Sequence, residues 1–162
     1  MSDFNTPQLQ LPRFDIRLQR DATGTVRLWD FLREKWIIVT PEEWVRQHFV
    51  NYLINYCGFP RSMMANEVGL TLNGTKRRCD TIIYTRALEP LCIVEYKRPS
   101  VKITREVFDQ IARYNSVIYA PYLIVSNGLT HYCCQFNGTT YRFLPAIPTY
   151  DQMLNNHQNK VL

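Results

Sequence analysis

The sequence lacks the cysteine pattern of a disulfide framework or a zinc site. Its five cysteines, at positions 57, 79, 92, 133 and 134, are odd in number and form no C-x-x-C pair. The three histidines fit no zinc-ligand spacing. Two of the cysteines, Cys79 and Cys92, fall within predicted strands. We therefore expect reduced thiols in the core of a cytoplasmic protein.

Targeting and membrane-spanning segments are also missing. The N-terminus has no basic-then-apolar signal sequence, and no run approaches the roughly 20 apolar residues that cross a bilayer. With 162 residues, 46% of them hydrophobic, the composition suits one globular domain without repeats. We expect a flexible N-terminal arm over residues 1–10, a single domain over residues 11–150, and a short helix or frayed tail over residues 151–162.

Acidic residues are fewer than basic ones. The chain has 19 Lys and Arg against 14 Asp and Glu, which gives a net charge of +5 and an isoelectric point near 9.0. This excess favours a polyanionic partner such as nucleic acid, but many basic proteins bind none. The net charge by itself therefore does not show whether the protein binds nucleic acid.

Three charged residues stand where two apolar strands should carry none. Residues 80–84 and 91–96 are rich in β-branched, aromatic and other apolar side chains, which predicts two strands joined by a short turn. Glu95 and Lys97 are two apart and share a face. If the turn is centred on residues 87 and 88, Asp80 lies opposite Glu95, whereas a one-residue slip would move it to the other face.

With that register, two carboxylates and one ammonium group converge on a mostly buried surface. Buried charge is costly unless it is paired or bound to a metal. Mg²⁺ takes oxygen ligands and needs only one or two carboxylates besides water and substrate phosphate. The pattern is therefore typical of a site for metal-assisted phosphodiester hydrolysis. A salt bridge on a solvated edge strand is the alternative.

The remaining elements predict an α/β fold, a mixed central sheet flanked by helices. Residues 15–18 are expected to pair as a short strand, and residues 27–30 and 35–39 are expected to form a strand or turn pair that leads into the first helix. Thr40, Pro41 and Glu43 predict a capped first helix with a capping box, and Thr104 predicts the cap of a second helix. The expected order is helix, three antiparallel strands, helix, a further strand reached by a crossover, and a hairpin.

Several charged residues near this hairpin have two interpretations. Glu67 opens the preceding strand, where it is either a solvated edge charge or a neighbour of the site. The basic run Lys76, Arg77 and Arg78 suits phosphate contact at the mouth of an acidic site, or it is simply a charged turn.

These motifs together resemble the N-terminal nuclease domain of the restriction subunit of type I restriction-modification systems, a branch of the PD-(D/E)xK nuclease superfamily. The resemblance covers roughly residues 12–148. It rests on the segments 11–13, 29–31, 40–46, 78–80, 94–97, 108–115 and 126–128. One departure is Cys79, which stands where the signature has proline. Another is the absence of a G-x-x-x-x-G-K-[ST] motor motif, so we expect the nuclease domain alone.

The resemblance implies a restriction-endonuclease-like PD-(D/E)xK core and a Mg²⁺- or Mn²⁺-dependent DNA endonuclease. Asp80 and Glu95 would hold the metal, with the Tyr96 carbonyl as a further ligand. Lys97 would orient or activate the attacking water. Glu43, on the first helix, would be a third acidic group at the metal, as an alternative to its capping role.

The resemblance also implies an auxiliary pair and a DNA-contacting surface. Gln110 and Tyr114, four residues apart on the second helix, match a Q-x-x-x-Y motif that helps position the DNA or the active lysine. The basic residues implied for DNA binding are Lys76, Arg77, Arg78, Arg98, Lys102, Arg105 and Arg113. The implied partners are DNA and the methylase and specificity subunits of a restriction-modification system.

Two rival functions remain open at this point. The first is a catalytically silent nucleic-acid-binding module of the same fold. The second is a hydrolase that uses Asp80 and Glu95 as an acid/base pair. Against the second, Lys97 beside Glu95 would lower the pKa of that carboxyl, the wrong direction for a general acid.

Overall fold

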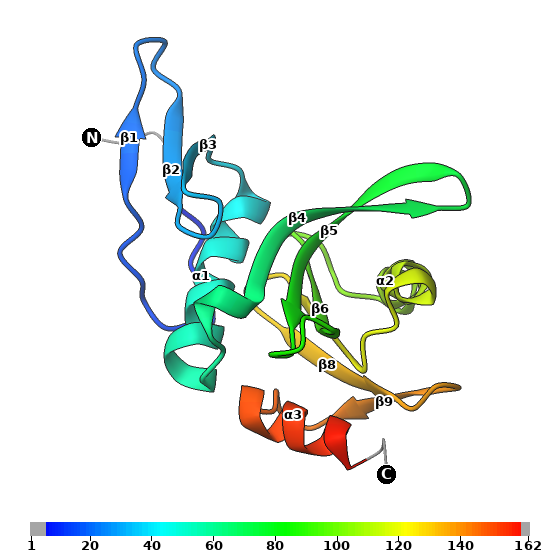
Figure 1. The fold of residues 1–162 in the computed structure, drawn as a ribbon. Helices are drawn as coiled ribbons and strands as arrows, with labels where there is room; N and C mark the ends of the chain where they lie inside the picture. Colours follow the sequence, from blue (N-terminus) through cyan, green and yellow to red (C-terminus); the bar gives the residue numbers. More distant parts are fainter. Residues whose placement is uncertain (1–5, 160–162) are drawn as a thin grey trace.

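The structure is a computed structural model that describes residues 6–159 (Figure 1). Short N-terminal strands form one antiparallel sheet, and six later strands form a second, mixed sheet. The first sheet has the order β1-β2-β3, with β1 at Leu18–Arg20, β2 at Val26–Asp30 and β3 at Lys35–Ile38. Helix α1 (Pro41–Cys57) and a 3-10 turn (Arg61–Met63) lead into the second sheet.

The second sheet has the order β4-β5-β6-β7-β8-β9. Its elements in chain order are β4 Met64–Leu72, β5 Thr75–Tyr84, β6 Pro90–Tyr96, α2 Arg105–Ile118, β7 Tyr122–Ser126, β8 His131–Phe136 and β9 Tyr141–Leu144, followed by α3 Tyr150–Gln158. All neighbours are antiparallel except β6 and β7, which are parallel because α2 carries the chain back between them. The predicted order of elements and the mixed sheet are confirmed.

Helices cover both faces of the central strands, so these strands are apolar on both sides (Figure 1). On one face α1 and α3 pack against β6 and its neighbours, with Phe49 and Val94 in the shared core. On the other face α2 packs through Ile111 against Ile82 and Ile93. The end of β6 is thereby held rigidly between two helical layers.

The residues at the turns and at most helix caps are those that favour these conformations. Asn73 and Gly74 both have positive φ (50° and 75°), the conformation of a tight β4–β5 hairpin turn, as their sequence predicts. Thr40 Oγ1 accepts a hydrogen bond from the Glu43 backbone N–H. The second half of the predicted capping box does not form, because the Glu43 carboxylate turns to the Arg33 guanidinium instead. The predicted final helix is present as α3, with its own capping box.

Some sequence-based boundaries differ from the structure. The first strand lies at Leu18–Arg20 and not at residues 15–18. Of the arm expected to be flexible, residues 1–5 lie outside the described part. The rest is docked: Gln10 N–H donates to the Gly128 carbonyl at 2.8 Å, and Leu9 packs on the main core. Buried apolar contacts with α1 therefore hold a segment whose polar composition suggested a loose end.

The five cysteines are free and buried, as expected for core thiols. Burial raises the pKa of the Cys134 thiol to about 11 and that of Cys133 to about 12. Within residues 6–159, no helix combines the length and the apolar character needed to cross a membrane.

Candidate active site

The pairing of β5 with β6 brings Asp80, Glu95 and Lys97 together. Thr81 is paired with Val94, so the next position of the ladder sets Asp80 against Glu95, the register predicted from the turn. The Asp80 Oδ2 atom accepts a hydrogen bond from the Tyr96 backbone N–H at 2.9 Å. Lys97 Nζ lies 3.6 Å from Glu95 Oε1. Two carboxylates and one ammonium group therefore share one small site.

Asp80 and Glu95 oppose each other's ionisation, and both are largely buried. Burial, reinforced by the negative charge of Asp80, raises the pKa of Glu95 to about 8, although Lys97 opposes the shift. Burial also raises the pKa of Asp80, against the Tyr96 N–H hydrogen bond and the positive charge of Arg46. Glu95 is only 6% exposed, and its Oε2 atom has no hydrogen-bond partner among the described residues.

A buried arginine, which the sequence-based analysis did not single out, lies beside this pair. Arg46 of α1 is 5% exposed. Its Nη2 atom lies 2.5 Å from Glu67 Oε1 and 3.4 Å from Asp80 Oδ1, and its Nη1 atom lies 3.5 Å from Glu43 Oε1. The guanidinium also lies 5.7 Å from the centre of the Tyr96 ring. Its burial could have been inferred from the sequence, because Arg46 precedes Phe49 by three residues and Val50 by four and so shares their inward-facing side of α1.

Glu67 is drawn into the same cluster by an unusual backbone. Its φ is 57°, in the left-handed region, which costs a non-glycine residue about 1–2 kcal/mol. It lies between the pairs Asn66–Thr81 and Val68–Cys79, hence opposite Asp80 on β5. The interpretation of Glu67 as a solvated edge charge is therefore wrong, since its carboxylate binds Arg46 and also lies 3.6 Å from Arg78.

Glu43 is close to the pair but separated from it by Arg46. Its carboxylate accepts hydrogen bonds from Arg33 at 3.1 and 3.3 Å. Burial raises its pKa, while Arg46 and Arg33 oppose the shift. Between residues 6 and 159, no three acidic, histidine or cysteine side chains lie close enough together to hold a metal. A divalent cation would thus rely on Asp80 and Glu95, oxygen donors of the number and type that suit Mg²⁺.

The predicted auxiliary pair shares one face of α2. Gln110 Nε2 donates to the Tyr114 hydroxyl at 3.4 Å. Both side chains line a hollow of about 530 Å³ between α2 and the β4–β5 hairpin, together with Arg77 and Arg113. The structure therefore groups this pair with two of the predicted DNA-binding residues, at a hollow that does not include Asp80 or Glu95.

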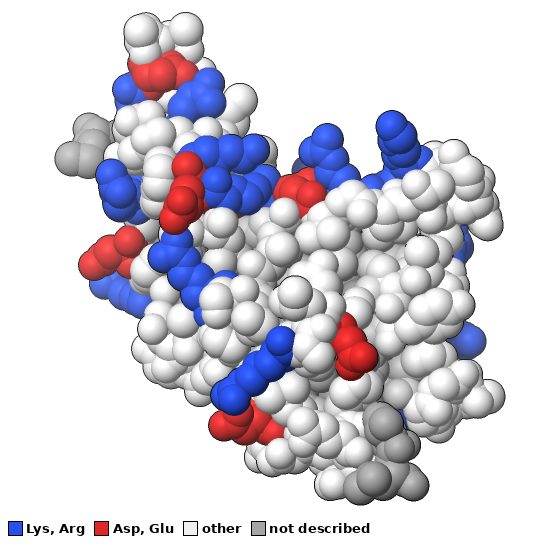
Figure 2. Space-filling model, in the orientation of Figure 1, with Lys and Arg blue, Asp and Glu red and all other residues white. Residues whose placement is uncertain are grey.

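The other basic residues lie at three places. Lys76, Arg77 and Arg78 are exposed on β5 and line a second hollow of about 660 Å³ along the hairpin. Arg98 and Lys102 are exposed in the loop that follows β6. Figure 2 shows Lys and Arg atoms along the upper edge of the molecule, from the N-terminal sheet to the β4–β5 hairpin, with acidic atoms between them.

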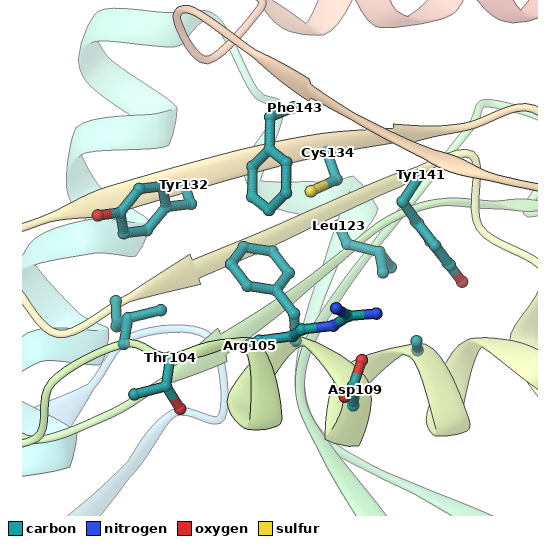
Figure 3. A pocket seen from close by; sticks show the side chains of 11 residues that line it. Thr104, Arg105, Asp109, Leu123, Tyr132, Cys134, Tyr141 and Phe143 are labelled. Carbon is teal, nitrogen blue, oxygen red and sulfur yellow. The ribbon is translucent and has the colours of Figure 1, made fainter.

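Arg105 lies apart from these groups. It borders a pocket of about 580 Å³ between α2 and strands β7 to β9 (Figure 3). The pocket is largely apolar: the Phe108 ring lies 4.9 Å from that of Phe143 and 6.1 Å from that of Tyr132, both edge-on. None of Asp80, Glu95 and Lys97 lines it. This apolar pocket is thus separate from the carboxylate pair.

The chain is similar to known proteins both in sequence and in fold. Residues 41–148 match the family described as the type I restriction enzyme R protein N terminus. A solved structure described as a fragment of an HsdR subunit of a type I restriction enzyme from Vibrio vulnificus YJ016 is similar with a TM-score of 0.59 at 15% identity. That match covers 74% of this chain and 25% of the other, so it concerns the fold of one part of a longer protein. A comparison with curated proteins found no match.

Proposed function

The chain belongs to the family of type I restriction enzyme R protein N termini, and from that premise we propose that it is a divalent-metal-dependent DNA endonuclease domain with a PD-(D/E)xK core. The observation that carries the proposal is the buried Asp80–Glu95 pair with Lys97 beside it. Two carboxylates that face each other at low exposure repel unless one is protonated or a cation lies between them. Burial, together with the negative charge of Asp80, raises the pKa of Glu95 when no cation is bound.

In this proposal Asp80, Glu95 and the Tyr96 carbonyl hold Mg²⁺ or Mn²⁺. When bound, the cation polarises a phosphoryl oxygen and makes a nearby water more acidic. The Tyr96 N–H and Arg46 stabilise the ionised form of Asp80. Lys97 Nζ, 3.6 Å from Glu95, orients the attacking water and offsets the charge that develops on the phosphate.

The residues around the carboxylate pair bind the DNA in this proposal. Gln110 and Tyr114, which line a hollow with Arg77 and Arg113, help to position the DNA, and the two arginines contact its phosphates. The remaining phosphate contacts come from Lys76, Arg78, Arg98, Lys102 and Arg105. Nothing in this set reads base edges, so the cleavage that we propose shows no strong sequence preference. The proposed partners are DNA and the methylase and specificity subunits of a restriction-modification complex.

Plasmid nicking tests the proposal. The wild type, Glu95→Gln and Lys97→Ala are compared with Mg²⁺, with Mn²⁺ and with EDTA. The exposed Glu89 and Lys35, changed to Gln and Ala, serve as matched controls. We expect cleavage that requires the cation, is unchanged in the controls and falls by about 1,000-fold in both site variants, since several kcal/mol of transition-state stabilisation are lost.

Three results would count against the proposal. Folded wild type that binds DNA but does not cut it with either cation would favour the silent binding module. Cleavage that persists in both site variants would mean a different site or a contaminant. Sequence-specific cleavage by the chain alone would contradict the proposed mode of DNA contact.

A further inference from the structure

Two arginines of the N-terminal sheet carry charges that the proposed reaction does not use. Arg17 and Arg20 are exposed, beside and on β1, the edge strand of that sheet. The Arg17 guanidinium lies 5.3 Å from the centre of the Trp29 ring and 5.5 Å from that of Trp36. Arg20 Nη1 donates a hydrogen bond to the Gly24 carbonyl at 2.6 Å. Uncharged partners therefore hold both guanidinium groups in place.

The positive charges of these two side chains are not neutralised. Within residues 6–159, neither Arg17 nor Arg20 forms an ion pair with a carboxylate, whereas Arg27 on the next strand pairs with Asp21 at 3.0 Å. A guanidinium presents several N–H donors in one plane, an arrangement that matches phosphate oxygens. Guanidinium groups that are positioned but unpaired are therefore suited to contact with a polyanion.

A chain of hydrogen bonds fixes the N-terminal sheet to the candidate active site. Asp30, at the end of β2, is fully buried and accepts a hydrogen bond from Asn66 Nδ2 at 3.2 Å. Asn66 Oδ1 accepts one from Thr81 Oγ1 at 2.7 Å, and Thr81 Oγ1 accepts one from the Tyr96 hydroxyl at 3.0 Å. The backbone N–H of Tyr96 in turn binds Asp80. The sheet therefore has a defined position relative to the carboxylate pair.

Basic side chains lie on two projecting elements of the molecule. The N-terminal sheet and the β4–β5 hairpin extend from the body on two sides (Figure 1). Figure 2 shows Lys and Arg atoms over both elements and a dip in the surface between them. The hairpin already supplies the exposed Lys76, Arg77 and Arg78 in the proposed function. A long polyanion can therefore contact both elements at once.

We propose that the N-terminal sheet is a second DNA-contacting element, in which Arg17 and Arg20 bind backbone phosphates of the same duplex that the β4–β5 hairpin contacts. The inference rests on the proposed function, which places that duplex at Asp80 and Glu95. The duplex lies across the dip between the sheet and the hairpin. Because the added contacts are to phosphates, they raise affinity without adding a sequence preference.

Fluorescence anisotropy with a labelled DNA duplex tests this contact. Binding to the full chain is titrated in EDTA, to prevent metal-dependent cleavage, at several KCl concentrations. The test variant combines Arg17→Gln with Arg20→Gln, and a rescue variant combines Arg17→Lys with Arg20→Lys, which keeps both charges. The matched control combines Arg86→Gln with Arg142→Gln, which removes two exposed charges outside the proposed DNA-binding set.

The expected effect is on both affinity and its salt dependence. Each phosphate contact contributes about 0.9 to the slope of log K against log salt concentration. We expect the test variant to bind about 10-fold more weakly at about 0.1 M KCl and to lose about 2 from that slope. The rescue variant and the control should keep the wild-type slope, and each chain should bind one duplex.

Undiminished affinity and slope in the test variant would overturn the inference and would favour a protein partner for this sheet. An equal loss in the control or in the rescue variant would overturn it too, as would two duplexes bound per chain. The proposed function fails separately. If binding depends on Arg17 and Arg20 but the wild type does not nick DNA with either cation, the contact stands and the endonuclease does not. Nicking by the wild type with full binding by the test variant would mean the reverse.

Discussion

Replacing Glu95 with glutamine should remove a pH-dependent loss of stability from the metal-free protein. The side chain is buried, and its pKa lies at about 8 in the folded chain against an ordinary value of 4.5. A raised carboxyl pKa means that the folded state holds the proton more tightly than the unfolded state. The contribution of Glu95 to stability is therefore largest at low pH and is lost as the pH rises from 4.5 through about 8.

The size of the effect follows from that difference. The difference between a pKa of 4.5 in the unfolded chain and about 8 in the folded chain corresponds to about 5 kcal/mol, of which about 3 kcal/mol falls between about pH 6 and about pH 9. Glu95→Gln has no proton to lose, so its free energy of unfolding should vary much less with pH. Asp80 should also ionise more easily in this variant, because the opposing charge is gone.

Urea unfolding in EDTA at about pH 6 and about pH 9 measures the effect, with the exposed Glu42→Gln as control. Guided by linkage, we expect the wild type and the control to lose about 3 kcal/mol and Glu95→Gln to lose clearly less. Equal stability of the wild type at both values would refute the reasoning, as would an undiminished loss in Glu95→Gln. Added Mn²⁺ should flatten the wild-type dependence, because a bound cation replaces the proton.

Two further predictions concern the C-terminal end of α2. Asn115 is buried and exchanges hydrogen bonds with both backbone groups of Ala120, at 2.9 and 2.6 Å. Asn115→Ala should destabilise the fold by about 2–4 kcal/mol in urea unfolding, with the neighbouring exposed Ser116→Ala as control; a loss below about 1 kcal/mol would mean that water satisfies these groups. Tyr119 is exposed and has a φ of 60°, a left-handed conformation that glycine adopts without strain. Tyr119→Gly should therefore increase the free energy of unfolding by about 0.5–1 kcal/mol and raise the melting temperature. A lower melting temperature would show that the Tyr119 ring makes a contact worth more than the backbone strain.

Four acidic side chains lie near one another, and Arg46, Arg33, Arg78 and Lys97 divide them into ion pairs. Among the buried carboxylate oxygens of residues 6–159, only Glu95 Oε2 is left without a hydrogen-bond partner. In the proposed function this oxygen, on the side of the cluster next to Lys97, binds the cation.

The sequence by itself predicted the hairpin on which the candidate site is built. Asp80 and Glu95 are separated by one short turn, and a turn centred on residues 87 and 88 sets them opposite each other, as the structure has them. The same local rules predicted the Asn73–Gly74 turn, the Thr40 cap and the shared face of Gln110 and Tyr114. The predicted resemblance to the N terminus of type I restriction R subunits is confirmed over residues 41–148, and the PD-(D/E)xK assignment stays a prediction.

Only the tertiary structure revealed the roles of Arg46 and Glu67. Arg46 contacts Glu67, which is 21 residues away in the sequence, and Asp80, which is 34 residues away. The packing of α1 on the sheet brings them together. No periodicity encodes such a contact, because it depends on how a helix is placed and on the left-handed backbone of Glu67. The docking of residues 6–10 on α1 has the same origin. Strand register is a local property with a period of two, whereas the charge balance of a buried site depends on long-range packing.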